Sequence, residues 1–221
     1  MSRNTLYLLV LIAAVGIGGL WYINQPPDPG PSLSVGNEQS ADDIDTSIVQ
    51  EMSLGNPDAD VTVIEYASFT CPHCRNFHEQ VFGQLKAEYI ETGKINFIHR
   101  EVYFDRFGLW AGIVARCGGA DRYFGIADLI YRQQSEWTAG GDPATLAANL
   151  RIIGKTAGLT EEQLDACFAD ADKAQAMVAL YQQNAQADNV QSTPTFVING
   201  EKFSNMNYAE FAAVLDEKLA E

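Results

Sequence analysis

The chain has 221 residues, enough for one medium-sized domain with its own core, and its 29 acidic and 14 basic residues give a formal net charge of −15. This balance argues against nucleic acid as a partner and against docking on anionic lipid headgroups, because both need clustered Lys and Arg. The four cysteines, an even number, are compatible with two disulfides, but that inference depends on the compartment: Cys71, Cys74, Cys117 and Cys167.

The N-terminal segment predicts that compartment. Residues 5–23 carry no charge, and a helix of this length would rise about 28 Å, close to a bilayer core of about 30 Å. Arg3 is the only basic residue before Arg75, so the positive-inside rule predicts that the rest of the chain is exported. We expect residues 1–23 to be an uncleaved anchor in the inner membrane. The alternative is a cleaved signal peptide and a soluble periplasmic protein.

Residues 24–50 differ in composition from what precedes and follows them. They contain four prolines and many Ser, Gly, Asn and Asp residues, with few large apolar side chains. This composition predicts a flexible, solvated, acidic linker. Beyond it, residues 48–54 could form a short edge strand.

The next elements form a strand, a helix and a second strand. Residues 61–67 are apolar on both faces apart from Glu65, which is typical of a strand buried on both sides. Residues 95–100 predict a second strand, and a strand-helix-strand unit of this length predicts that the two strands are parallel. We assign residues 51–106 to this first half.

A Cys-Pro-His-Cys motif, residues 71–74, stands between the first strand and the helix. Apolar residues then follow at helical spacing and mark one face: Phe77, Val81, Phe82, Leu85 and Tyr89. The first cysteine is therefore expected at the helix N-terminus, where unpaired N–H groups and the helix dipole favour a thiolate. The thiolate is the form of cysteine that attacks disulfides.

Residues 107–187 have a helical pattern almost throughout. Asp142-Pro143 predicts an N-cap followed by proline at the first helical position, and Gly158 would end that helix. Thr160 opens a capping box for the next helix. We expect three to five helices in this block.

Residues 188–221 again contain a sequence pattern typical of strands. A strand at 195–198 is followed by Asn199-Gly200, a strong hairpin signal, and Asn207 opens a capping box for a last helix. The order strand, helix, strand, helical block, hairpin, helix predicts an α/β thioredoxin fold. It carries an inserted all-helical domain and is preceded by an N-terminal transmembrane or signal helix.

Two stretches together resemble a known family. Phe-Thr-Cys-Pro-His-Cys at 69–74 and Thr-Pro-Thr-Phe-Val-Ile-Asn-Gly at 193–200, with about 80 helical residues between them, are similar to the DsbA family of exported thiol-disulfide oxidoreductases. The resemblance covers residues 52–221. It implies that Pro194 is a cis-proline beside the active-site cysteines and that Glu65 is the family's buried acid. One departure is His78, which stands where the best-known members have an acidic residue.

The motif residues each have a role in this interpretation. Cys71 is expected to be the exposed nucleophile and Cys74 the buried resolving thiol, while Pro72 and His73 complete the motif. The His73 side chain could donate a hydrogen bond to the Cys71 thiolate and stabilise the reduced form. A structural disulfide or half a zinc site is the alternative. Zinc usually needs two close pairs of ligands, which the remaining cysteines and histidines do not supply.

Other residues are expected around this motif. A buried Glu65 would have a raised pKa and could accept or relay the Cys74 proton, with Arg100 on the adjacent strand as its partner. A cis bond at Pro194 would expose the Thr193 N–H and C=O for pairing with an extended substrate peptide. His78 is expected on the polar side of its helix, in a structural role.

The two remaining cysteines both lie in the helical block. Two packed helices can bring Cys117 and Cys167 within the roughly 4.4–6.8 Å Cα separation of a disulfide. The alternative is a pair of buried free thiols. An exported chain favours the bond, and so does the resemblance, since some family members carry a second disulfide.

The function predicted from these residues is oxidation of dithiols in exported proteins, without metal or organic cofactor. The expected partners are reduced exported proteins and, by resemblance, a membrane quinone-linked thiol oxidase such as DsbB. Two alternatives remain at this stage. One is a disulfide isomerase or reductase of the same fold, and the other is a chaperone-like binding module whose cysteines are structural.

Overall fold

The computed structural model of the protein describes residues 44–221. The expected anchor at 1–23 and most of the linker at 24–50 lie outside the described residues. Within residues 44–221, no helix combines the length and the apolar character that a membrane crossing requires.

A five-stranded mixed sheet forms the centre, with the strand order β1-β3-β2-β4-β5. β2 and β3 are parallel and all other neighbours are antiparallel, which confirms the parallel pair predicted from the sequence. β2 lies in the middle because its residues are apolar on both faces and need cover on both sides. The strands are β1 (Met52–Gly55), β2 (Val61–Ala67), β3 (Ile95–Glu101), β4 (Thr195–Ile198) and β5 (Glu201–Ser204).

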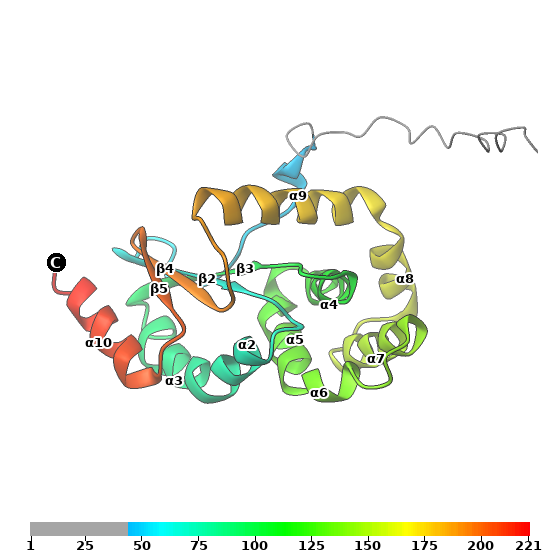
Figure 1. The fold of residues 1–221 in the computed structure, drawn as a ribbon, viewed down its shortest axis with the longest axis horizontal. Helices are drawn as coiled ribbons and strands as arrows, with labels where there is room; N and C mark the ends of the chain where they lie inside the picture. Colours follow the sequence, from blue (N-terminus) through cyan, green and yellow to red (C-terminus); the bar gives the residue numbers. More distant parts are fainter. Residues whose placement is uncertain (1–43) are drawn as a thin grey trace, which may run out of the picture. The chain divides into compact units, whose positions relative to one another are not determined.

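Helices cover both faces of the sheet (Figure 1). On one face lies a continuous helical run from Pro72 to Ile90, together with α10 (Tyr208–Lys218). The side chains of Val63, Phe97 and Phe196 join this packing. The run consists of α2 (Pro72–Phe77), η3 (His78–Phe82), α3 (Gly83–Leu85) and η4 (Lys86–Ile90), and both η segments are π-helical.

Six helices connect β3 to β4 in the described chain, one more than the upper expectation from the sequence. Asp142 and Thr160 cap their helices as predicted, because each side chain accepts from a backbone N–H of the first turn. The longest helix, α9, lies on the opposite side of the sheet from α2, α3 and α10 (Figure 1). The six are α4 (Arg106–Cys117), α5 (Ala120–Arg132), α6 (Gln134–Trp137), α7 (Pro143–Thr156), α8 (Glu161–Ala169) and α9 (Ala171–Ala187).

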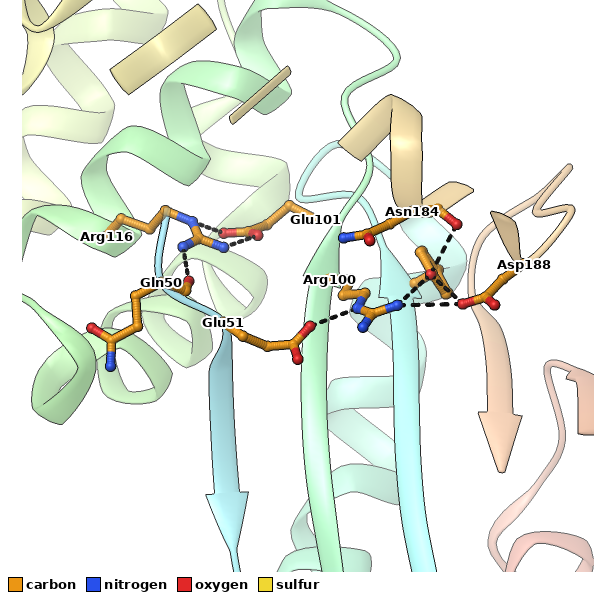
Figure 2. A network of polar contacts seen from close by, with 8 residues as sticks. Gln50, Glu51, Arg100, Glu101, Arg116, Asn184 and Asp188 are labelled. Atoms are coloured by element: carbon orange, nitrogen blue, oxygen red, sulfur yellow. Dashed lines mark hydrogen bonds and ion pairs between the residues drawn. The ribbon is translucent and has the colours of Figure 1, made fainter. Parts of the chain in front are cut away.

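Two arginines tie neighbouring segments to β3 (Figure 2). The buried Arg116 of α4 donates to both carboxylate oxygens of Glu101 and to the Gln50 carbonyl oxygen, 2.6 Å away. Arg100 donates to Glu51 at 2.7 Å and to Asp188, just after α9, at 3.3 Å. Because successive residues of a strand face opposite sides, β3 is fastened to the helical block on one face and to the end of α9 on the other.

Candidate active site

The Cys-Pro-His-Cys motif occupies the first turn of α2. Cys71 is the N-cap residue and Pro72 stands at the first helical position, where a missing N–H costs no hydrogen bond. The Cys71 side chain is half-buried, whereas Cys74 is fully buried, and both are free thiols. The site is therefore in its dithiol form, with one sulfur reachable from solvent and the other one turn deeper.

The two thiols have pKa values displaced in opposite directions. Hydrogen bonding from the Cys74 thiol lowers the pKa of Cys71 to about 5, assisted by Thr193 and by the backbone N–H groups of Cys74 and His73. Burial raises the pKa of Cys74 well above its usual range, and the negative charges of Cys71 and Glu65 raise it further. The reduced site thus holds one thiolate, on Cys71, and one proton, on Cys74.

The His73 ring is exposed, between the two cysteines in sequence. Its backbone N–H is aimed at Cys71 and helps to lower the pKa of that thiol. The stabilising donor that the structure shows at this position is therefore the backbone of the first helical turn. The imidazole contribution expected from the sequence stays a prediction.

The loop before β4 lies against the motif. The peptide bond between Thr193 and Pro194 is cis, and the Thr193 carbonyl oxygen lies 3.5 Å from the Cys71 sulfur. The Thr193 hydroxyl is buried and, among residues 44–221, has no hydrogen-bond partner in the dithiol form. It lies where it can donate to a Cys71 thiolate, which accounts for its share in lowering the Cys71 pKa.

Behind Cys74 lies a buried carboxylate-imidazole pair. The Glu65 side chain is fully buried, and its two oxygens lie 3.2 and 3.0 Å from Nε2 of His78. The prediction that His78 faces the polar side of its helix is wrong, since only 8% of the residue is exposed. His78 follows Cys74 by four positions, so both lie on the same face of the helix, and that spacing could have revealed it.

Sequence reasoning missed His99, which joins the same cluster. In the parallel β2–β3 register His99 stands directly opposite Glu65. Its Nδ1 lies 2.7 Å from the Tyr123 hydroxyl, and its Nε2 lies 3.1 Å from the Tyr131 hydroxyl. Glu65, His78 and His99 lie close together, but their facing atoms are already engaged with one another or with the tyrosines. We therefore interpret the cluster as a hydrogen-bonded network.

The family model described as thioredoxin matches residues 47–217. The chain belongs to the thioredoxin family. Among solved structures of this family, the crystal structure of alpha-DsbA1 from Wolbachia pipientis is similar, with a TM-score of 0.71 and 26% identity, covering 78% of this chain and 92% of that one. This likeness confirms the resemblance to DsbA proteins. BdbD from Bacillus subtilis, in its oxidised form, has a TM-score of 0.66 at 21% identity, covering 77% of this chain and 94% of that one.

Curated proteins are similar to this chain in sequence as well. A Rickettsia bellii protein, whose name assigns it provisionally to the protein-disulfide oxidoreductases, is 33% identical over 77% of this chain. The match spans 65% of that relative, and 61% of a similarly named Rickettsia felis protein. Disulfide bond formation protein D of Bacillus subtilis is 26% identical, over 78% of this chain and 79% of its own length.

The predicted partnership between Glu65 and Arg100 is wrong. In the β2–β3 register Arg100 stands opposite Tyr66, and the Tyr66 hydroxyl accepts a hydrogen bond from it at 2.8 Å. Because side chains alternate along a strand, Arg100 points to the α9 side of the sheet and Glu65 to the α2 side. In this thioredoxin-family chain the partner of the buried acid is a histidine of the helix.

Two polar side chains, one in the helical block and one at the residue that caps its first helix, support the active-site loop, and neither was predicted. Gln134 of α6 is buried, and its amide donates to the carbonyl oxygens of Phe69 and Cys71 at 2.8 and 3.0 Å. Asp105, which caps α4, accepts from the Thr70 hydroxyl at 3.2 Å. The helical block therefore positions the residues that lead into the motif.

The second cysteine pair forms a disulfide in the structure. Cys117, at the end of α4, is joined to Cys167 of α8, with a Cα–Cα distance of 5.9 Å. Both residues are partly exposed. The bond links the first helix of the block to the fifth, across 50 positions of the sequence.

Proposed function

We propose that the protein is a thiol-disulfide oxidoreductase that introduces disulfide bonds into exported proteins through Cys71 and Cys74. The observation that carries the proposal is the opposite displacement of the two cysteine pKa values, with Cys71 at about 5 and Cys74 raised by burial. A thiolate that is stabilised only in the reduced form favours reduction of the protein, so its disulfide is a strong oxidant of other dithiols.

The reaction follows from which sulfur is reachable. A substrate thiolate attacks the half-buried Cys71 sulfur of the oxidised protein, the Cys71–Cys74 bond breaks, and a mixed disulfide forms. Cys74 leaves with the electron pair and takes up a proton. The second substrate thiolate then attacks the substrate sulfur of the mixed disulfide, which closes the substrate disulfide and releases Cys71 as a thiolate. Two electrons pass to the protein, and the second substrate proton goes to solvent.

Substrate binding is assigned to the loop around Thr193 and Pro194. The Thr193 carbonyl oxygen lies 3.5 Å from the Cys71 sulfur, so a peptide that pairs with this backbone in an extended form would bring its own cysteine to the reactive sulfur. Backbone pairing makes few demands on side chains. This mode therefore suits an enzyme that accepts many unfolded substrates.

The partners, the compartment and the domain boundaries belong to the same proposal. Reduced exported proteins would be the substrates and a membrane quinone-linked thiol oxidase of the DsbB type the reoxidant. The uncharged segment at 5–23 supports export and anchoring in the inner membrane, with release after signal cleavage as the other outcome. We propose 51–106 and 188–221 as the two halves of the thioredoxin fold, with 107–187 as the insertion.

The deciding experiment is the Cys71–Cys74 reduction potential, measured by equilibration against glutathione. We expect a potential above that of the glutathione pool, together with rapid oxidation of reduced RNase and weak reduction of insulin. A potential near that of thioredoxin, about −270 mV, would instead indicate a reductase. Restoration of activity to scrambled RNase would indicate an isomerase. Absence of all three activities would leave a binding module.

A further inference from the structure

Cys74 needs a proton route that its position does not provide directly. When the active-site disulfide opens, Cys74 must gain a proton, and when it closes, Cys74 must lose one. Its side chain has no exposed surface. Burial and the charge of Glu65 both raise its pKa, so the proton is held firmly. A group with contact to both the interior and the solvent is required to move that proton at a useful rate.

His78 has both contacts. On the inner side its Nε2 lies 3.0 Å from one oxygen of Glu65, the carboxylate whose charge reaches Cys74. On the outer side it lines a groove of about 510 Å³ between η3 and α5, together with Phe82, Phe124 and Arg132. The residue as a whole is 8% exposed and its side chain 4%. One residue thus contacts both the buried carboxylate and the groove.

The ring is held in one orientation. It stacks on Tyr131 of α5 with 4.0 Å between the ring centroids and 16° between the planes. His78 is also the first residue of a π-helical segment, and such segments in α-helices are frequent at functional sites. The stack and the hydrogen bond to Glu65 fix where both ring nitrogens lie. Such fixed positions are what proton transfer by a side chain demands.

We propose that Glu65 and His78 carry the Cys74 proton between the buried sulfur and the solvent of the η3–α5 groove. The inference rests on the proposed function, because it concerns the same pair of thiols. When the disulfide opens, His78 takes a proton from the solvent of the groove and passes it to the Glu65 carboxylate, which hands it on to the Cys74 thiolate and is a carboxylate again. When the disulfide closes again, the proton travels the same route outward. The electron pair stays with the sulfurs, and the reoxidant is the thiol oxidase class named above.

His99 does not share this role. Both of its ring nitrogens are bonded to tyrosine hydroxyls, and burial lowers its pKa, so it stays neutral and fixed. Charged and titratable groups surround His78 on several sides. These come from β2, β3, α5 and its own helix: Glu65, His99, Tyr131, Asp121, Asp128, Arg132, Cys74, Glu79 and Lys86.

Closure of the Cys71–Cys74 disulfide can be measured separately, and it requires Cys74 to lose its proton. Reduced protein is mixed with glutathione disulfide, so that Cys71 forms a mixed disulfide, and samples are quenched in acid at successive times. Mass spectrometry then gives the first-order rate at which Cys74 displaces glutathione. We expect His78→Ala to slow this step about a hundredfold near neutral pH. Added imidazole, which the groove can admit, should restore much of the rate and bring back the wild-type pH profile.

Two further variants keep the test decisive. His78→Gln retains a donor toward Glu65 but cannot pass a proton, so it should be as slow as His78→Ala and gain nothing from imidazole. Tyr131→Phe keeps the stacked ring and removes only the hydroxyl at His99, so its closing rate should match the wild type. Closing at the wild-type rate in both His78 variants, or slow closing that imidazole leaves unchanged, would overturn the inference.

Failure of this inference and failure of the proposed function are separable. The wild-type protein is tested in parallel for oxidation of reduced RNase. Normal RNase oxidation with a closing rate independent of His78 removes only the proton route. Loss of RNase oxidation in the wild type removes the proposed function itself.

Discussion

Cys71 and Cys74 lie within one turn of α2, whereas Cys117 and Cys167 lie 50 positions apart on α4 and α8. The first pair is unequal, because one thiol is half-buried under helix N–H donors and the other is enclosed. The second pair is nearly symmetric, since both residues are partly exposed and both lie in the last turn of their helices. Because the pKa values within the first pair differ, the Cys71 sulfur is a nucleophilic thiolate and the Cys74 sulfur keeps its proton. In the second pair neither sulfur is favoured as a nucleophile, so the disulfide acts only as a crosslink.

The comparison predicts that removing each pair harms a different property. In Cys117→Ala/Cys167→Ala the loop closed by the bond is released, and the chain-entropy model gives a loss of unfolding free energy of about 4 kcal/mol. The Cys71 pKa and the rate of RNase oxidation should remain near the wild-type values. Urea unfolding and an ultraviolet thiolate titration measure the two quantities. A large shift of the Cys71 pKa would show that the pairs are coupled.

The loop in front of the first pair should depend on the helical block. Gln134→Leu leaves the buried Phe69 carbonyl oxygen without its side-chain donor, whereas the Cys71 carbonyl oxygen keeps the Arg75 N–H. An unpaired buried group costs about 1–3 kcal/mol. We expect lower stability and a slower attack of Cys71 on glutathione disulfide. The matched control is Gln133→Leu, the preceding residue on the same segment. An equal effect of both substitutions would contradict a specific role for the Gln134 amide.

Reduction of the first pair should stabilise the protein, the reverse of what the second pair does. The Cys71 pKa is lowered from 9.0 to about 5, so this stabilisation is complete above pH 9 and is lost as pH falls through about 5. At pH 7 we expect about 1–2 kcal/mol after allowing for solvent screening of a half-exposed group. Paired urea melts of the reduced and oxidised forms between pH 5 and 9 test this. A gap that widens as pH falls would contradict the assignment.

The smallest expected effect concerns the buried hydroxyl beside Cys71. Thr193→Val keeps the shape of the side chain and removes the donor, so the Cys71 pKa should rise by about 0.5–1 unit, the value of one hydrogen bond. Thr195→Val is the control, because its hydroxyl is bonded to the Ser192 carbonyl oxygen instead. An unchanged Cys71 titration in Thr193→Val would mean that the helix N–H groups alone set the pKa.

The sequence predicted the sheet and the motif because those signals are local. The β2 pattern, the Cys-Pro-His-Cys turn and the caps at Asp142 and Thr160 each depend on residues within a few positions of one another. Register and inter-element contacts are different. Arg100 was expected beside Glu65, but the register places His99 there, and a shift of one residue reverses the face of every side chain. The support from Gln134 reaches across more than 60 positions, and no spacing rule reports it.

His78 lies between these two cases. Its position four residues after Cys74 is a local signal for the buried face, but its polar character suggested the opposite side. What makes burial acceptable is the carboxylate of Glu65, 13 positions away on another element. A polar residue can take an interior position when a partner satisfies it there. Helical periodicity alone was therefore not enough to place His78 in the interior. The position of Glu65 on β2 was also needed.

The arginine contacts at β3 also have a mechanical consequence (Figure 2). Arg116 holds the Gln50 carbonyl oxygen and Arg100 holds the Glu51 carboxylate, on two consecutive residues just before β1. A pulling force applied at the residue-44 end would meet these contacts before it reached the strand. The load would pass through Glu101 and Arg116 into α4, and α2 would bear little of it. When a force acts on this end of the domain, the contacts of β3 and α4 would carry it. The spacing of the two reactive sulfurs on α2 would then stay constant.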